Sequence, residues 1–314
     1  MRRILGLETL GEPLRQSTVT IGKFFAIHRG HQALIRATVE AARRNGGPAV
    51  VLTFDRHPLE VLRPGTEFPV IATLEERLDL IEAEGADATV VVRLTPEFLG
   101  QEPEAFIREV LVRKLGAIEV LASDNFRFGR SARGDLALLR EEGSKLGFRC
   151  SSILPVLEGG ERISSSRIGA CVDAGRVREA ADLLGRPYCL AGDVVPGEQL
   201  GRRLGFPTAN VRTDPQRLLP ANGVYVVRAR LGKEPGPLHP AVANLGTRPT
   251  VGGAGRRLEV HLLDWQGDLY GQEVRVEFLE HVRPEQRFAG LDALRAQIDR
   301  DVAAAREYFR QDPA

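Results

Sequence analysis

Several residue types are scarce in this chain, and each scarcity disfavours a class of protein. The 314 residues include 3 cysteines, Cys150, Cys171 and Cys189. They are far apart and form no Cys-x-x-Cys pair, so neither a disulfide framework nor a zinc cluster is expected, and a reducing cytoplasm is the simplest location. One tryptophan and 4 tyrosines leave little aromatic surface for stacking on single-stranded nucleic acid.

An excess of one charge sign is also lacking. Lys plus Arg number 43 against 42 Asp plus Glu, which gives a formal net charge of +1. Because nucleic acids and anionic lipid surfaces attract positively charged proteins, this charge balance disfavours a general binder of either. A local basic pocket for a small phosphate is compatible with the same balance. No apolar run approaches the roughly 20 residues that span a bilayer. The N-terminal segment has charge but no long apolar core, so a secretory signal is not expected.

The length is that of two domains, and the first half alternates strand and helix patterns. Such alternation predicts βαβ units, with a parallel sheet covered on both faces. Glycines at 46, 85, 116 and 147 are expected to end helices in the left-handed conformation. The expected strands are Ser17–Ile21, Ala49–Phe54, Ala88–Leu94 and Ile118–Leu121, and the expected helices are His31–Arg44, Leu74–Glu84, Pro103–Leu115 and Asp135–Leu146.

The pattern changes at about residues 184–188, after a last helix over Val177–Leu184. Short strand-like runs divided by Gly and Pro follow, which predicts a small antiparallel barrel or sandwich. We therefore expect one domain over residues 1–184 and another over 185–314. The strands expected in the second domain are Leu190–Val195, Gly223–Leu231, Ala241–Leu245, Arg257–Leu263 and Glu273–Leu279, before a closing helix over Leu291–Phe309.

A His-x-Gly-His segment, His28 to His31, follows the first expected strand and a glycine turn at Gly22. In open α/β sheets, ligands lie beyond the carboxyl ends of the strands, and a helix N-terminus suits a phosphate. Two histidines there can donate to phosphate oxygens as charge builds up in a transition state, and Gly30 permits close backbone approach. A single histidine here would more often be a surface residue beside a helix cap, but the pair in this position favours a functional site.

This segment resembles the signature of the nucleotidyltransferase superfamily. Three more segments follow in order, Thr53–Pro58, Asp124–Gly129 and Ile163–Ile168. Together they resemble the adenylyltransferase half of the bacterial bifunctional FAD synthetases, the riboflavin kinase/FMN adenylyltransferases, and so imply a Rossmann-like nucleotidyltransferase domain. The resemblance implies that His28 and His31 are catalytic and that the nucleotide is bound by Gly22, Phe24, Gly30, Asn125, Ser164 and Ser165.

The first half departs from that family's pattern at a few positions. Phe25 and Ala26 stand where the family has Asp and Gly, Ser123 stands for a Gly, and Gly169 stands for an Arg. Lys23 occupies a position where a small or neutral polar residue is usual, and could supply a compensating positive charge.

The second half carries another candidate site between Gly201 and Asn210. Thr208 and Asn210 each offer an oxygen, the donor that Mg²⁺ prefers, and a spacing of two on an extended segment points both side chains the same way. In the later strand, alternation places Glu259 on the face opposite Leu258 and Val260. A carboxylate there could remove a proton from an attacking hydroxyl. Taken singly, the first segment could be an ordinary turn and Glu259 a solvent-facing residue.

The region as a whole resembles the riboflavin kinase fold, a β-barrel with a closing helix. The resemblance implies that Thr208 and Asn210 hold Mg²⁺ and ATP phosphates, that Gly205 contributes to nucleotide binding, and that Glu259 is the general base on the ribityl 5′-hydroxyl. It places Arg283 and Phe288 beside the flavin. The matching segments are Leu204–Asn210, Asn222–Tyr225, Asn244–Thr250, Leu269–Gly271, Arg283–Phe288 and the pattern Leu294, Gln297, Ile298 and Asp301.

The resemblance thus implies a cytoplasmic enzyme that phosphorylates riboflavin to FMN and adenylylates FMN to FAD. It would use ATP as co-substrate and Mg²⁺ as cofactor, with riboflavin, FMN, FAD and ATP as partners and neither nucleic acid nor membrane. Because of Phe25, Ala26 and Gly169, a riboflavin kinase whose first domain is impaired or uses another nucleotide is the alternative. A flavin- or nucleotide-binding regulatory module without turnover is a rival from another class.

Overall fold

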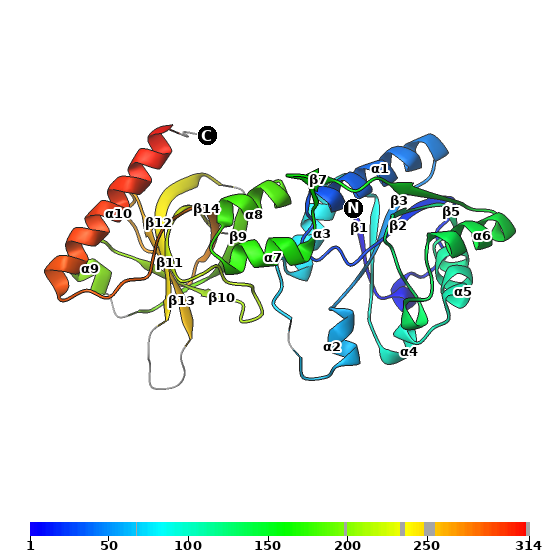
Figure 1. The fold of residues 1–314 in the computed structure, drawn as a ribbon, viewed down its shortest axis with the longest axis horizontal. Helices are drawn as coiled ribbons and strands as arrows, with labels where there is room; N and C mark the ends of the chain where they lie inside the picture. Colours follow the sequence, from blue (N-terminus) through cyan, green and yellow to red (C-terminus); the bar gives the residue numbers. More distant parts are fainter. Residues whose placement is uncertain (67, 198–199, 233–235, 248–254, 312–314) are drawn as a thin grey trace. The chain divides into compact units, whose positions relative to one another are not determined.

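The computed structural model describes residues 1–66, 68–197, 200–232, 236–247 and 255–311 (Figure 1). The contacts within the chain divide it into two compact units, Met1–Ser165 and Ser166–Ala314. Among the described residues, no helix combines the length and the apolar character needed to cross a membrane. Each unit is described in turn.

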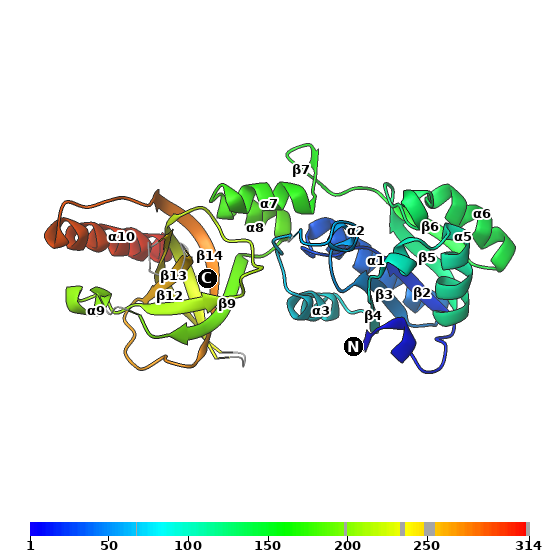
Figure 2. The ribbon, with the colours of Figure 1, turned by 90° about the horizontal axis from the view of Figure 1, so that it is seen from below.

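The first unit is built on a 6-stranded sheet in the order β1-β4-β3-β2-β5-β6. All of its strand pairs are parallel, as the nearly continuous apolar strands predicted. Figures 1 and 2 show the sheet between its helices. The strands are β1 (Arg2–Leu5), β2 (Ser17–Ile21), β3 (Ala49–Phe54), β4 (Ala88–Val92), β5 (Ala117–Ser123) and β6 (Arg149–Ile153), and a separate hairpin joins β7 (Leu157–Glu158) to β8 (Glu161–Arg162).

Two apolar clusters cover the two faces of this sheet. On one face, Val50 and Leu52 of β3 belong to a cluster with Ile107 and Leu139. On the other face, Val51 packs with residues of α1 and α3, because successive strand side chains point to opposite faces. The helices are α1 (Arg29–Asn45), α2 (Pro58–Leu62), α3 (Leu74–Ala83), α4 (Pro96–Leu99), α5 (Pro103–Phe106) and α6 (Leu136–Leu146), with short 3-10 turns η1 (Leu7–Thr9) and η3 (Arg130–Ala132).

The predicted layout of the first unit is confirmed, with differences in detail. The four glycines expected at helix ends all have positive φ, 71° at Gly46, 89° at Gly85, 55° at Gly116 and 86° at Gly147. The single helix expected over Pro103–Leu115 consists instead of α5 followed by a π-helical stretch, η2 (Ile107–Lys114). The edge strands β1 and β6 were not predicted.

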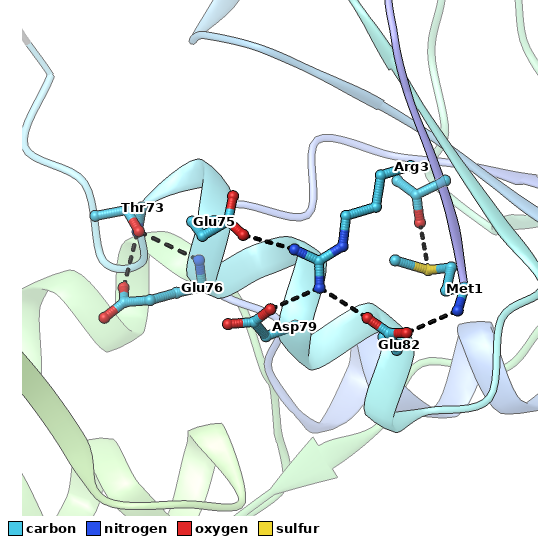
Figure 3. Close-up of polar contacts among 8 residues, drawn as sticks. Met1, Arg3, Thr73, Glu75, Glu76, Asp79 and Glu82 are labelled. Carbon is cyan, nitrogen blue, oxygen red and sulfur yellow. Dashed lines mark hydrogen bonds and ion pairs between the residues drawn. The ribbon is translucent and has the colours of Figure 1, made fainter. Parts of the chain in front are cut away.

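Ion pairs attach the edge strand β1 to helix α3 (Figure 3). The guanidinium of Arg3 lies 2.6 Å from a carboxylate oxygen of Glu75 and 2.7 Å from oxygens of Asp79 and Glu82. The N-terminus of α3 is fixed by a capping box between Thr73 and Glu76. Helix α3 is therefore held at several points along its length.

The second unit is a closed antiparallel barrel in the order β10-β13-β12-β11-β14-β9, in which β9 also pairs with β10. The sequence left a barrel and a sandwich open, and the barrel is the outcome. Tyr225, Phe278 and Val260 fill its interior with side chains that are fully buried. The strands are β9 (Tyr188–Val195), β10 (Ala209–Thr213), β11 (Gly223–Leu231), β12 (Leu238–Thr247), β13 (Arg256–Leu262) and β14 (Glu273–Pro284). Of these, β10 was not predicted.

Helices cover part of the outside of the barrel. Ala305 of α10 (Leu291–Gln311) packs on Val224, Val226 and Val242, whose side chains point outward. Helix α8 (Val177–Leu184) contacts β14 and β9 and buries Val177, Leu183 and Leu184. Helix α7 (Ser165–Asp173) precedes it, and the short α9 (Leu200–Leu204) precedes β10.

Candidate active sites

His28 and His31 are held together at the N-terminus of α1. His28 is the N-cap residue, and its Nδ1 accepts a hydrogen bond of 3.2 Å from the backbone N–H of His31. The two imidazole rings are stacked, with centroids 3.6 Å apart. Because Nδ1 of His28 is the acceptor, the neutral ring carries its proton on Nε2, a donor for an anionic ligand oxygen. Helix α1 adds the positive end of its dipole at the same place.

Gly30 is required by the packing of these rings. A Cβ added at Gly30 would lie 3.2 Å from two atoms of the His28 ring. A side chain at this position would therefore press on the imidazole that caps the helix. This glycine allows the cap and the ring stack to coexist, while the close backbone approach to a phosphate predicted for Gly30 stays a prediction.

The turn that leads from β2 into His28 is strained. Phe24 has a φ of 49° and Ile27 a φ of 42°, in the left-handed region that bulky and β-branched side chains avoid. Both side chains are fully buried. Each such residue costs on the order of 1–3 kcal/mol and persists only where its surroundings impose it. At the start of this turn, a Cβ on Gly22 would lie 2.9 Å from the Phe24 ring, so Gly22 makes room for that ring.

A hairpin connects two predicted nucleotide-binding segments. Glu158 of β7 forms an ion pair with Arg29, the residue after His28. Arg162 of β8 forms an ion pair with Asp124, the residue before Asn125, and this pairing lowers the pKa of Asp124. The hairpin therefore holds the start of α1 and the segment after β5 in one arrangement.

Of the other residues predicted to bind the nucleotide, one precedes this hairpin in the sequence and two follow it. Asn125 is exposed, and its Oδ1 accepts a hydrogen bond of 3.1 Å from Ser123. Ser164 and Ser165 follow β8 and lie at the start of α7, where both are half-buried. The structure thus brings His28, His31 and Asn125 into one connected region through the hairpin.

Phe25 packs between a cation and an imidazole. The Arg77 guanidinium carbon lies 5.0 Å from the centroid of the Phe25 ring, and the His57 ring centroid lies 5.3 Å away. His57 in turn stacks on Phe68, with centroids 4.6 Å apart. Burial lowers the pKa of His57, and the positive charge of Lys23 adds to that shift. Sequence reasoning missed Arg77, which lies among charged residues of an amphipathic helix.

In the barrel, Glu259 has an asparagine on each side. Antiparallel register places Asn210 of β10 opposite Glu259 of β13 and places Asn244 of β12 opposite it on the other side. Leu258 and Val260 are buried inside the barrel while Glu259 is half-buried. The predicted alternation is therefore confirmed, and the carboxylate lies on the outer face. Asn244 was quoted in a motif, but without a role.

The loop before β10 is attached to the same strand. His261 of β13 makes a hydrogen bond of 2.8 Å to the carbonyl of Pro207, and its ring meets the Phe206 ring edge to face. Gly205 has a φ of 93° and nothing within 4 Å of an added Cβ, so it ends α9 in an open turn. The amide of Asn210 lies against Gly197, where a Cβ would collide with it.

Arg283 and Phe288, the residues predicted to lie beside the flavin, lie in and just after β14, two strands from Asn244 in the barrel order. Arg283 of β14 is in register with Val224, which is in register with Asn244. The Arg283 guanidinium makes hydrogen bonds of 2.9 and 2.7 Å to the two carboxylate oxygens of the buried Asp301 in α10. It also lies 5.7 Å from the centroid of the Phe288 ring. Asp301 therefore orients Arg283 and, through it, the segment that carries Phe288. The end of the Asn244–Thr250 motif lies outside the described residues.

The donors around Asn210 suit a hard cation. Thr208 offers a hydroxyl, Asn210 an amide oxygen, and Glu259, opposite Asn210, a carboxylate, and Mg²⁺ takes oxygen ligands of these kinds. Among the described residues, no group of three or more His, Cys, Asp or Glu side chains could hold a metal ion. A site of this type would depend on the phosphates of a bound nucleotide for its remaining ligands.

These two units define a class of transferase. The first has the parallel sheet of a nucleotidyltransferase with two stacked histidines at the start of a helix, and the second is a six-stranded barrel with a carboxylate beside oxygen donors that suit Mg²⁺. Comparison with known families agrees, since the FAD synthetase family matches residues 11–167 and the riboflavin kinase family matches residues 184–309. The chain belongs to the bacterial bifunctional riboflavin kinase/FMN adenylyltransferases.

Individual relatives match over nearly the full length. The chain is 41% identical to the bifunctional riboflavin kinase/FMN adenylyltransferase of Escherichia coli K12, over 98% of each chain. It is 38% identical to the protein of the same name from Pseudomonas fluorescens, over 98% of this chain and 97% of the other. A crystal structure described as a macrolide-efflux protein from Streptococcus pneumoniae is 30% identical, with a TM-score of 0.89 over 98% of this chain and 99% of that one.

Proposed function

We propose that this protein makes FMN and FAD in two successive transfers. The barrel phosphorylates riboflavin with ATP, and the α/β unit joins FMN to the adenylyl group of a second ATP. The observation that carries this proposal is the match of each half to its own family together with 41% identity to a bifunctional relative across both halves. The alternative, a kinase with an impaired first half, is not favoured by these matches.

In the barrel, Glu259 is the general base of phosphoryl transfer. Its carboxylate takes the proton of the ribityl 5′-hydroxyl as that oxygen attacks the γ-phosphorus of ATP, and the bond to the β-phosphate oxygen breaks to release ADP. Thr208 and Asn210 would hold Mg²⁺ against the phosphates, and Gly205 lies in the loop that carries them. When bound, Mg²⁺ supplies positive charge to the phosphate oxygens. Arg283 and Phe288 lie beside the flavin.

In the α/β unit, the FMN phosphate attacks the α-phosphorus of ATP and pyrophosphate leaves. No proton needs to be removed from the attacking phosphate oxygen, so positioning and charge stabilisation are the main requirements. His28 and His31 donate hydrogen bonds to the phosphate oxygens at the N-terminus of α1. The remaining residues predicted to bind the nucleotide are Gly22, Phe24, Gly30, Asn125, Ser164 and Ser165, and Phe24 can contribute only its backbone because its side chain is fully buried.

The three free cysteines support a location in a reducing compartment. Cys150, Cys171 and Cys189 are all free. Burial raises the pKa of Cys150 and of Cys171, which keeps both as unreactive thiols at neutral pH. We place the enzyme in the cytoplasm on this basis.

One assay tests the proposal. The full chain is incubated with riboflavin, ATP and Mg²⁺, and the products are separated and identified. FMN together with FAD is expected. FMN alone would support the kinase with an impaired first half, and neither product would support a binding module without turnover. A parallel reaction that starts from FMN measures adenylyl transfer separately from phosphorylation.

A further inference from the structure

Arg77 is a charged residue in an unusual environment. It lies in the middle of α3 and is 3% exposed. Among the described residues it makes no ion pair with a carboxylate, and its Nε has no hydrogen-bond partner. Removing a charge from water without pairing it is costly. The guanidinium charge of Arg77 must therefore be stabilised by the other contacts that it makes.

Its guanidinium holds the ends of two segments at the carboxyl side of the sheet. Nη1 donates hydrogen bonds of 3.3 Å to the carbonyl of Lys23 and 3.0 Å to that of Phe54, and Nη2 donates one of 3.4 Å to that of Asp55. Lys23 lies in the turn after β2, Phe54 is the last residue of β3, and Asp55 follows it. One side chain thus connects the turn to the neighbouring strand.

The turn is held at both of its ends. The Lys23 carbonyl also accepts a hydrogen bond of 3.0 Å from the hydroxyl of Thr53. At the other end, the side chain of Gln32 donates a hydrogen bond of 3.0 Å to the carbonyl of Ile27. Phe24 and Ile27, the two non-glycine residues of this turn with positive φ, lie within the segment that these bonds hold. Such a conformation persists only when surrounding contacts impose it, and Arg77 supplies two contacts to the turn, its hydrogen bond to the Lys23 carbonyl and its cation–π contact with Phe25.

The end of this turn is His28, which caps α1 and stacks on His31. We propose that Arg77 is a positioning residue for adenylyl transfer, which fixes the strained turn so that His28 and His31 meet the phosphates in the productive geometry. The inference rests on the proposed function of the first unit. Arg77 touches no reacting atom in this account and acts through the turn.

Phe25 explains how a cation is tolerated there. Its ring covers the guanidinium at 5.0 Å, a cation–π contact that partly replaces water. Burial lowers the pKa of Arg77 to about 10, so the side chain stays charged at neutral pH. Phe25 occupies a position where the resembled pattern has Asp, and the carboxylate charge that favours the Arg77 cation comes from Asp55, which acts against the effect of burial on the pKa.

The test compares Arg77→Met, which keeps the side-chain length but removes charge and donors, with the native full chain. Steady-state FAD formation from FMN and ATP gives kcat and KM separately, and riboflavin phosphorylation is measured on the same samples. We expect kcat for FAD formation to fall about 10²-fold, the size of loss that a misplaced reacting group causes. KM for both substrates and the kinase activity should change little.

Arg3→Met is the matched control. Arg3 also binds α3, through Glu75, Asp79 and Glu82 (Figure 3), and none of these three partners lies in the turn. If Arg77 acted only by anchoring α3, this control would lose kcat as well. Equal losses in the two variants would overturn the proposal, and so would a change confined to KM.

Two milder variants decide the question if Arg77→Met fails to fold. Arg77→Lys keeps the charge but has one nitrogen and cannot reach all three carbonyls, so kcat should stay reduced. Thr53→Val removes the other donor to the Lys23 carbonyl and should cause a smaller loss of kcat. Native kcat in both would overturn the inference while the proposed function stands. Failure of the native chain to make FAD would overturn the proposed function and this inference with it.

Discussion

Asn210 and Glu259 are directly paired across the antiparallel strands β10 and β13. Residues opposite each other in such a pair have Cβ atoms about 5 Å apart, so an amide oxygen and a carboxylate lie side by side on the outside of the barrel. The proposed general base and the proposed metal ligand are thereby placed on the same patch of surface.

The first prediction concerns the base. Glu259→Gln should lower the rate of FMN formation by about 10²–10⁴-fold, the usual contribution of a general base. ATP binding should be retained, because the amide has the same shape. Initial rates and nucleotide binding are measured on the same preparation. Glu277→Gln is the control, since Glu277 is also half-buried on an outward-facing position of the barrel. Native turnover in Glu259→Gln would remove Glu259 from the mechanism.

The second prediction concerns the metal. Asn210→Ala and Thr208→Ala should each raise the Mg²⁺ concentration needed for half-maximal FMN formation, because each removes an oxygen donor. A Mg²⁺ titration at saturating ATP measures the shift. Thr213→Ala, at the far end of β10, should leave the titration unchanged. Curves that superimpose for all variants would contradict a metal role for Thr208 and Asn210.

The third prediction separates capping from catalysis at His28. Asn is a good N-cap residue, so His28→Asn should keep the stability of α1 while lowering FAD formation by about 10²–10³-fold, as the loss of one donor to a developing anion does. His28→Ala should lose the same activity and in addition about 1 kcal/mol of unfolding free energy. Rates and thermal unfolding are measured for both, with FMN formation as the unaffected reference. Full activity in His28→Asn would limit His28 to a structural role.

The fourth prediction concerns where the second domain begins. A fragment over residues 185–314 contains the whole barrel, whereas one over residues 166–314 also contains α7 and α8. Both should phosphorylate riboflavin. The longer fragment should be more stable by several kcal/mol, because Val177, Leu183 and Leu184 are at most 1% exposed and burial of each such side chain contributes roughly 1.5–3 kcal/mol. Denaturant unfolding of the two fragments compares them, and equal stability would show that α8 contributes nothing to the barrel.

The fifth prediction is a pH dependence of stability. The pKa of His57 is lowered in the folded protein from an ordinary value of 6.5, so the unfolded chain binds the proton first as pH falls. Stability from this group is therefore present above pH 6.5 and is lost as pH decreases below it. Protonation also competes with the hydrogen bond that Nδ1 accepts from Leu59. Thermal unfolding at pH 8 and pH 5.5 should show a smaller loss for His57→Asn, which keeps a capping acceptor, than for the native protein.

Long, strongly patterned elements could be predicted from the sequence. The strands Ala49–Phe54 and Gly223–Leu231 and the helix Val177–Leu184 have the predicted bounds, because apolar runs and helical periodicity are local signals. The strands β1, β6 and β10 were missed. They are short and contain Arg2 and Arg3, Ser151 and Ser152, or Asn210 and Arg212, so their polar residues conceal a strand that pairing with neighbours creates.

The site was predictable only in part, for the same reason. The histidines and the Thr-x-Asn spacing lie in short motifs that can be read directly. The pairing of Asn244 with Glu259 depends on strand register, and the burial of Arg77 depends on how α3 packs. Neither leaves a local signal, because an arginine in a Glu-Glu-Arg-Leu run has the pattern of a solvent-exposed face.

Closure of the barrel has a consequence for how the protein fails when it is stressed. In the barrel each of the six strands has a neighbour on both sides, whereas the parallel sheet ends at β1 and β6. A strand with an unpaired backbone edge is a template for addition of another chain. On heating or storage, insoluble aggregates should therefore grow from the adenylyltransferase half, and resuspended aggregates that have lost FAD synthesis should retain flavin phosphorylation.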